Sequence, residues 1–239
     1  QTIPPFVFQN NWDDHGTAAL GEVAAQDNGY GCSGIAPDAQ FYTWPEYSVE
    51  QGSRRVTCIT NAIAASGVGD VVMLEMQTST TGSGYGPAEL NPAVWTVCST
   101  GTAAGVIVVA AAGNGNQNLD STSYSTYQSW GDSGAIIVGA GSASAAHSKL
   151  SFSSYGSRVN VQGWGTGVFT LGYGSFNSYG GDPHQSYASG FSGTSSATPF
   201  IAGSSAALQS YILAQGGIAL SSTEMRDLLI STGIAQGSG

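Results

Sequence analysis

FSGTSSATPFIAG, residues 191–203, is a polar turn followed directly by small and apolar residues that continue to about Leu213. The pattern predicts a tight turn that opens a buried helix, with Pro199 in the first turn, where a missing N–H costs little. Ser195 would then lie at the helix N-terminus, where unpaired N–H groups and the helix dipole stabilise a developing anion. Such a place suits a nucleophilic serine, although a serine here can also be a simple helix cap.

Two further motifs precede this segment in the chain. His-Gly-Thr at residues 15–17 stands at the start of a predicted helix, and Ala-Ala-Gly-Asn-Gly at residues 111–115 follows an apolar strand. Together the three motifs resemble the histidine, oxyanion-asparagine and serine motifs of the subtilisin-like serine proteases. They occur in that family's order and at comparable spacing, and the resemblance extends from His15 to about Thr232.

The resemblance implies a secreted serine endopeptidase with protein or peptide substrates. Ser195 would attack the scissile carbonyl, and His15 would take and return the proton. Asn114, with the Ser195 N–H, would donate to the oxyanion. This chemistry requires no cofactor.

Substrate backbone is expected to pair with strand ends near the serine, by analogy with the family. The residues concerned are Leu74, Glu75, Met76, Ala112 and Gly113. Glu75 stands where the family commonly has a small residue, which alters the expected shape of the pocket.

The catalytic acid of the family comes before the histidine, on an early strand, and no such strand precedes His15 here. Asp13 and Asp14 are too near His15 in sequence to reach its far ring nitrogen while the other nitrogen faces Ser195. We interpret them as charges stabilised by a helix N-terminus. We therefore expect the acid on an upstream segment, supplied by an N-terminal fragment of the same precursor as a partner of this chain.

Two other functions remain to be weighed against the protease. A catalytically inactive relative that binds peptides or proteins is supported by the absent acid. An esterase of the α/β-hydrolase type is disfavoured, because it needs Gly-x-Ser-x-Gly and a serine that precedes the histidine. In this chain His15 precedes Ser195.

Strand and helix patterns alternate along the chain, which predicts a three-layer αβα fold with a mainly parallel central sheet, subtilisin-like, in a single domain over residues 1–239. Strands are expected at 40–44, 71–76, 106–110, 135–139 and 158–161. Helices are expected from His15, over 53–66, from Pro87 and over 222–230, and hairpins over 163–190.

Composition excludes several partners. The 239 residues include 41% hydrophobic but only 8% charged residues, with a net charge of −10 and a pI near 4.3. This balance argues against nucleic acid as a partner. No apolar run approaches the roughly 20 residues of a membrane span.

Metal sites are weakly indicated. In the family, the loop after the histidine helix often holds calcium, and Asn28 falls at the matching place, so a structural calcium ion is expected there. The alternative is an ordinary Asn-Gly turn. Asp182 and His184 form too sparse a pair to predict a metal or acid–base site.

The three cysteines allow one disulfide. Cys58 and Cys98 lie on predicted helices that precede adjacent core strands, and right-handed crossovers can place such helices side by side. We therefore expect a Cys58–Cys98 bond, with Cys32 left over in a glycine-rich loop. Three separate buried thiols are the alternative.

Overall fold

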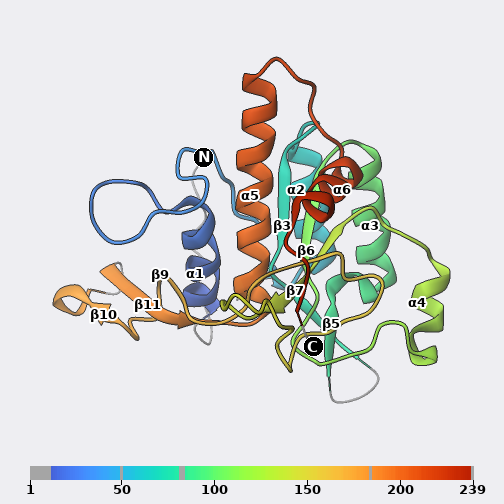
Figure 1. Cartoon of the computed structure of the whole chain (residues 1–239), viewed down its shortest axis with the longest axis horizontal. Coiled ribbons are helices and arrows are strands. Elements are labelled where there is room, and N and C mark those ends of the chain that lie inside the picture. Colours follow the sequence, from blue (N-terminus) through green and yellow to red (C-terminus); the bar gives the residue numbers. More distant parts are fainter. Residues whose placement is uncertain (1–11, 49–50, 81–83, 183–184, 238–239) are drawn as a thin grey trace.

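The computed structural model describes residues 12–48, 51–80, 84–182 and 185–237 (Figure 1). Its centre is a four-stranded parallel sheet in the order β3-β6-β7-β8. These strands are Val71–Leu74, Ile107–Ala111, Ile136–Gly141 and Val161–Trp164. The alternation of strand and helix patterns predicted this sheet, and the prediction is confirmed.

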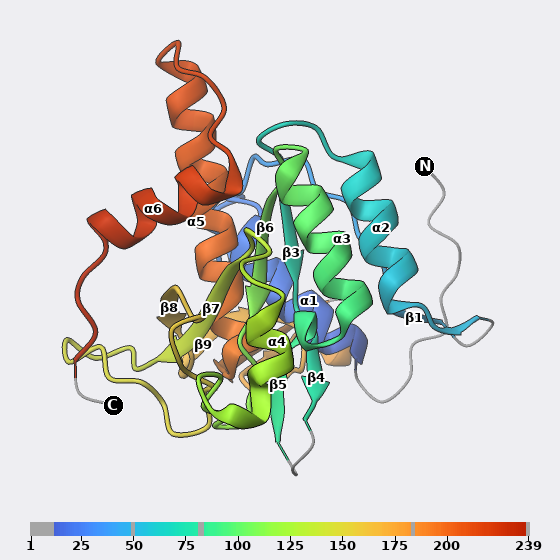
Figure 2. The same ribbon diagram turned by 90° about the vertical axis from the view of Figure 1, so that its right-hand side faces the viewer.

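Helices cover both faces of the sheet (Figures 1 and 2). On one face lie α2 (Arg55–Ala65) and α3 (Pro92–Ala103), which share a buried cluster with Val108. On the other lie α5 (Thr194–Ala214) and α6 (Ser222–Thr232), which pack against Val109. The result is the three-layer arrangement of an αβα fold.

Strands β6 and β7 are buried along their whole length. Their branched and small apolar side chains alternate between the two helical layers, so Val108 faces α2 and α3 while Ile107 and Val109 face α5 and α6. A strand covered on both faces needs apolar residues at every position, because neither side meets water. This requirement makes the two strands recognisable as uninterrupted apolar runs.

The longest helix, α5, has 21 residues and crosses the sheet close to it. Gly163 of β8 lies against the backbone of Ala197, where a Cβ would clash with the carbonyl oxygen, so the close approach depends on glycine. No helix in the described part of the chain is long and apolar enough to cross a membrane.

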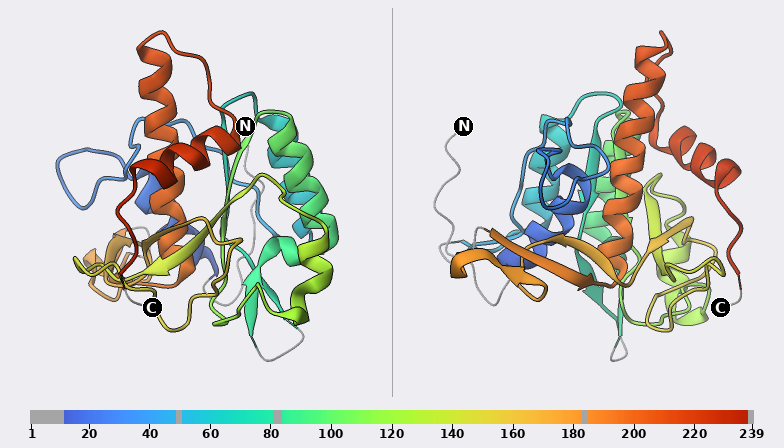
Figure 3. Two further views of the ribbon diagram at one scale, coloured as in Figure 1. Left: turned by 45° about the vertical axis from the view of Figure 1, so that its right-hand side comes forward. Right: turned by 60° about the vertical axis from the view of Figure 1, so that its left-hand side comes forward.

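Smaller elements surround this frame (Figure 3). Helix α1 (Trp12–Ala24) packs on an antiparallel sheet in the order β10-β11-β9. Its strands are β9 (Val168–Leu171), β10 (Asn177–Ser178) and β11 (Ser186–Phe191). The remaining elements are β1 (Tyr47–Ser48), β2 (Gly52–Ser53), β4 (Gln77–Ser79), β5 (Tyr85–Pro87), α4 (Ser125–Ser129) and the short 3₁₀ turns Ala88–Leu90, Thr122–Tyr124 and Tyr179–Gly181.

The prediction of a strand at 40–44 is wrong. That segment is irregular, with Phe41 52% and Tyr42 71% exposed. A strand needs a neighbour to pair with, and β3 is the last strand of the central sheet, without a partner on its outer side among the described residues. The apolar pattern at 40–44 therefore has no described strand to pair with.

Other boundaries shift for local reasons. Helix α3 begins at Pro92 rather than Pro87, because the Asn91 side chain caps the N–H groups of Ala93 and Val94. Strand β8 begins at Val161, where the predicted strand ended. The hairpins expected over 163–190 are confirmed by β9, β10 and β11.

The predicted Cys58–Cys98 disulfide is not formed. All three cysteines are free thiols, and Cys58 and Cys98 are buried in one apolar cluster between α2 and α3. The two helices do pack side by side, as expected. Cys58 Sγ instead donates to the carbonyl of Arg55, 3.1 Å away, so the two thiols serve as small core side chains.

We expect thiol titration to give three reactive groups per chain in denaturant. In the folded protein, Cys32 should react first, because it is half-buried while the other two are buried. Burial also raises the pKa of Cys98 to about 12, which keeps it from ionising. If titration in denaturant finds a single thiol per chain, the other two cysteines form a disulfide after all.

Candidate active site

His15 lies in the first half of α1 and packs edge-on against Phe191, with ring centroids 5.6 Å apart. Phe191 ends β11, and the chain passes from it through two residues into α5. Phe191 also packs on Ala18 and Ala19, so the contact fixes α1 beside the serine motif. Burial lowers the pKa of His15, which favours the neutral imidazole that a general base needs.

The described acids near His15 do not orient its ring. Asp14 Oδ1 accepts from the Tyr173 N–H at 2.8 Å, so this carboxylate holds the turn after β9. Within the described residues, neither ring nitrogen of His15 makes a hydrogen bond. The Asp13 side chain lies outside the described residues. The structure thus agrees with the interpretation that Asp14 is not the catalytic acid.

Asn114 is fixed by the first residue of α5. Its Oδ1 accepts from the Thr194 N–H at 2.8 Å and from Thr194 Oγ1 at 3.0 Å, while Thr194 Oγ1 accepts from the Gly113 N–H at 3.2 Å. With the oxygen held in this way, Nδ2 has no acceptor among the described residues. A Cβ on Gly193 would lie 3.0 Å from that nitrogen, so the amide donor lies directly beside the serine turn.

Ser195 is the second residue of α5 and is half-buried. The turn before it is held by Gly193, whose carbonyl accepts from the N–H groups of Ser196 and Ala197 at 3.2 and 3.3 Å. Gly193 has φ 103°, a conformation that favours glycine. The Ser195 hydroxyl and N–H have no partner among the described residues, so both remain available at a helix N-terminus.

The expected substrate-binding residues do not form one surface. Leu74 and Ala112 are buried in the core cluster beneath α2 and α3, and Met76 packs partly against it. Gly113 lies against the Gly86 backbone. Their side chains are therefore not presented to a ligand, and pairing of substrate with the local backbone stays a prediction.

Glu75 belongs to a feature that the sequence analysis missed, a pair of buried carboxyls that it forms with Glu22. Glu22 is 6% exposed, and burial raises its pKa to about 9, against the opposing effect of the Ser196 hydroxyl beside it. Glu75 is half-buried as a residue, but both its oxygens are shielded from water. Burial first, and then the Glu22 charge, raise its pKa well above the usual range.

A signal for this pair was present in the sequence. Glu22 follows His15 by two helical turns, on the face that also carries Ala18 and Ala19. A carboxyl on a helix face of small, closely packed residues is unexpected, so it indicates a special environment.

The calcium prediction at Asn28 stays untested. Asn28 Oδ1 accepts from the Tyr30 N–H at 3.4 Å in an exposed Asx turn. Within the described residues, no three acidic, histidine or cysteine side chains gather as metal ligands. The pair of Asp182 and His184 has no structural account, since His184 lies outside the described residues.

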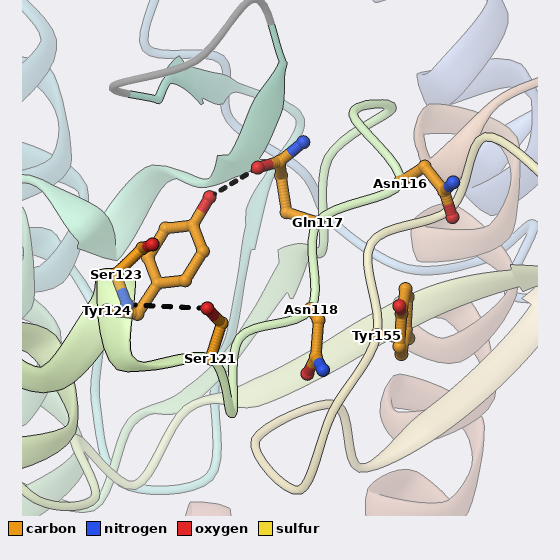
Figure 4. A pocket seen from close by; sticks show the side chains of 7 residues that line it. All are labelled: Asn116, Gln117, Asn118, Ser121, Ser123, Tyr124 and Tyr155. Atoms are coloured by element: carbon orange, nitrogen blue, oxygen red, sulfur yellow. Dashed lines mark hydrogen bonds between the residues drawn. The ribbon is translucent and has the colours of Figure 1, made fainter.

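A polar hollow of about 430 Å³ adjoins the loop that follows Asn114 (Figure 4). Tyr124 closes one side by donating its hydroxyl to Gln117 Oε1 at 2.6 Å. Amides and hydroxyls dominate the lining, which favours polar groups. The lining residues are Asn116, Gln117, Asn118, Ser121, Ser123, Tyr124 and Tyr155.

The comparison with known proteins agrees with this geometry. A sequence model of the Subtilase family matches residues 5–238. The chain belongs to the subtilase family. Similar subtilases include the alkaline protease of Alkalihalobacillus alcalophilus, 30% identical over 99% of this chain and 54% of its own length. Subtilisin NAT of Bacillus subtilis subsp. natto is 34% identical over 82% of this chain and 45% of its own.

This subtilase therefore spans about half the length of these two relatives. Solved structures support the fold. A cold-adapted subtilisin-like serine proteinase has a TM-score of 0.64 at 19% identity, covering 94% of this chain and 70% of its own. Proteases from Pseudoalteromonas arctica have a TM-score of 0.64 at 23% identity, covering 92% and 64%.

We expect Thr194→Val to destabilise the protein by about 1–3 kcal/mol, because it leaves the buried Gly113 N–H without an acceptor. It also frees one of the two bonds that fix the Asn114 amide. Thr194→Ser keeps the hydroxyl and is the matched control. Urea denaturation of both variants measures the difference, and equal midpoints would show that the hydroxyl has no such role.

Proposed function

We propose that this subtilase is the catalytic part of a secreted serine endopeptidase acting on proteins or peptides. The observation that carries the proposal is the fixed Asn114 amide. Its oxygen is held by Thr194, and within the part of the chain that the structure describes, Nδ2 and the nearby Ser195 N–H have no acceptor. Two donors at the start of a helix form an arrangement suited to a tetrahedral oxyanion.

In the proposed reaction, Ser195 Oγ attacks the carbonyl carbon of the scissile peptide bond while His15 takes the hydroxyl proton. The carbonyl oxygen becomes an anion that accepts from Asn114 Nδ2 and the Ser195 N–H. The C–N bond then breaks as His15 returns the proton to the leaving amine. A water molecule then attacks the acyl-enzyme in the same way, with His15 as the base, and releases the carboxylic acid product.

We propose that the missing acid is an aspartate on a strand that pairs with the outer edge of β3. Two observations support this. His15 makes no hydrogen bond among the described residues, and β3 has no described neighbour on its outer side. An unpaired edge accepts an added strand through its free backbone groups. The source we propose is an N-terminal fragment of the same precursor.

The alternative is a catalytically inactive relative that binds peptides. Among the described residues, the His15 imidazole has no hydrogen-bond partner, and this favours it, because a histidine without its acid is a weak base in this chemistry. The two functions differ in whether Ser195 reacts with an electrophile.

We expect a fluorophosphonate probe to label the active preparation at Ser195, and Ser195→Ala to abolish labelling and peptide hydrolysis. Ser192→Ala is the matched control, because Ser192 is an exposed serine in the same turn and lies outside α5. Peptide mapping locates the label. Hydrolysis that survives in a well-folded Ser195→Ala variant would remove Ser195 from its role.

We expect intact mass analysis of the labelled, active protein to show either a longer chain or a second peptide with an Asp-bearing strand. The reason is chemical, since loss of the triad aspartate costs about 10⁴ in turnover. An active preparation whose sole polypeptide is residues 1–239 would overturn the proposal and return the role to Asp13, Asp14 or water.

A further inference from the structure

The buried acids Glu22 and Glu75 come from different elements and lie close enough to influence each other's charge. Glu22 lies on the face of α1 that turns toward α5, beside Ser196. Glu75 follows β3 and lies close enough for the Glu22 charge to act on it. Among the described residues, none of the four carboxyl oxygens has a hydrogen-bond partner of good geometry.

Two carboxylates cannot both stay ionised in such a place. Burial removes the water that stabilises each charge, and the second charge repels the first. The usual remedy is a cation, but α1, α5, β3, β8 and β9 contain no lysine or arginine. Ser196 of α5 lies beside Glu22, and Glu75 lies within reach of its charge. Thr170 and Leu171 of β9 lie against the neighbouring Gly21.

His15 does not neutralise the pair either. It lies two helical turns before Glu22, and burial is the cause that shifts its pKa. A proton is therefore the cation available to the pair within the described structure.

Ser196 is positioned to accept a hydrogen bond from such a protonated carboxyl. Its Oγ donates to the Trp164 carbonyl at 2.9 Å, so its hydrogen is already committed. The hydroxyl oxygen can then take part with Glu22 only as an acceptor. An ionised carboxylate is also an acceptor and cannot complete this pair, whereas a protonated carboxyl can donate.

We infer that the Glu22 carboxyl, buried without a cation beside it, is protonated at neutral pH, and that it donates to Ser196 Oγ as a positioning group for the first turn of α5. The chain of bonds then runs from Glu22 through Ser196 to the Trp164 carbonyl of β8. It ties α1 to the residue that follows Ser195. Glu22 touches no reacting atom and acts through this turn.

Infrared spectroscopy tests the proton directly and does not depend on the proposed function. We expect the neutral-pH spectrum to contain the carbonyl-stretch band of a protonated carboxylic acid, shifted by ¹³C-glutamate labelling. Glu22→Gln should remove the Glu22 part of this band and weaken it, whereas Asp38→Asn, which changes an exposed acid, should leave it unchanged. A spectrum without this band in the folded wild type would overturn the inference.

The pH dependence of stability gives a second readout. Glu22 keeps its proton up to a pKa of about 9 in the folded protein, but loses it near its ordinary value of 4.5 when unfolded. The folded state therefore binds more protons between these values, and the melting temperature should fall as pH rises through this window. Glu22→Gln should flatten the curve, whereas Asp38→Asn should leave its slope. An unchanged slope in Glu22→Gln would contradict the protonated Glu22.

The positioning role is tested by the Ser195 probe, and this arm rests on the proposed function. Glu22→Gln keeps an N–H donor and should keep the labelling rate of the wild type at neutral pH. Glu22→Leu removes the donor and should slow labelling about tenfold, the factor for one hydrogen bond of ~1.4 kcal/mol. Equal rates in the two variants would refute the role. Absence of labelling in the wild type would instead count against the proposed function.

Discussion

The hydrogen bonds between Asn114 and Thr194 join the two halves of the site. They link Asn114, three positions after the end of β6, to the first residue of the longest helix, 80 positions later in the chain. The same threonine hydroxyl accepts from Gly113, so the strand end, the amide and the helix N-terminus form one unit. Each group of this unit is buried or half-buried, where an unmade bond costs more than a made one gains. The placement of Ser195 depends on this joint.

Much of this frame is predictable because its signals are local. The runs at 106–110 and 135–139 are apolar at every position, as strands covered on both faces must be. The small residues after Ser195 indicate a helix that packs close to a sheet. The motifs around His15, Asn114 and Ser195 resemble those of subtilases, and the comparisons confirm that the chain belongs to this family. Their catalytic roles stay proposals.

The features that escaped prediction depend on neighbours that a sequence does not show. The segment 40–44 has a strand-like pattern, but a strand forms only where another strand receives it. The thiols of Cys58 and Cys98 lie on adjacent helices, yet adjacency of helices does not fix where two Sγ atoms point. The meeting of Glu22 with Glu75 depends on how α1 docks beside β3. Each of these outcomes is set by tertiary packing rather than by the residues around it.

The outer edge of β3, which has no partner among the described residues, has a consequence for the colloidal behaviour of the protein. Free sheet edges tend to pair with one another between molecules, and like charge is one of the means that prevents it. With a net charge of −10 at neutral pH, molecules of this chain repel each other. Close to the pI of about 4.3 that repulsion vanishes, while the edge and the exposed Phe41 and Tyr42 remain. In mild acid, the chain therefore stays soluble only if another strand covers the outer edge of β3.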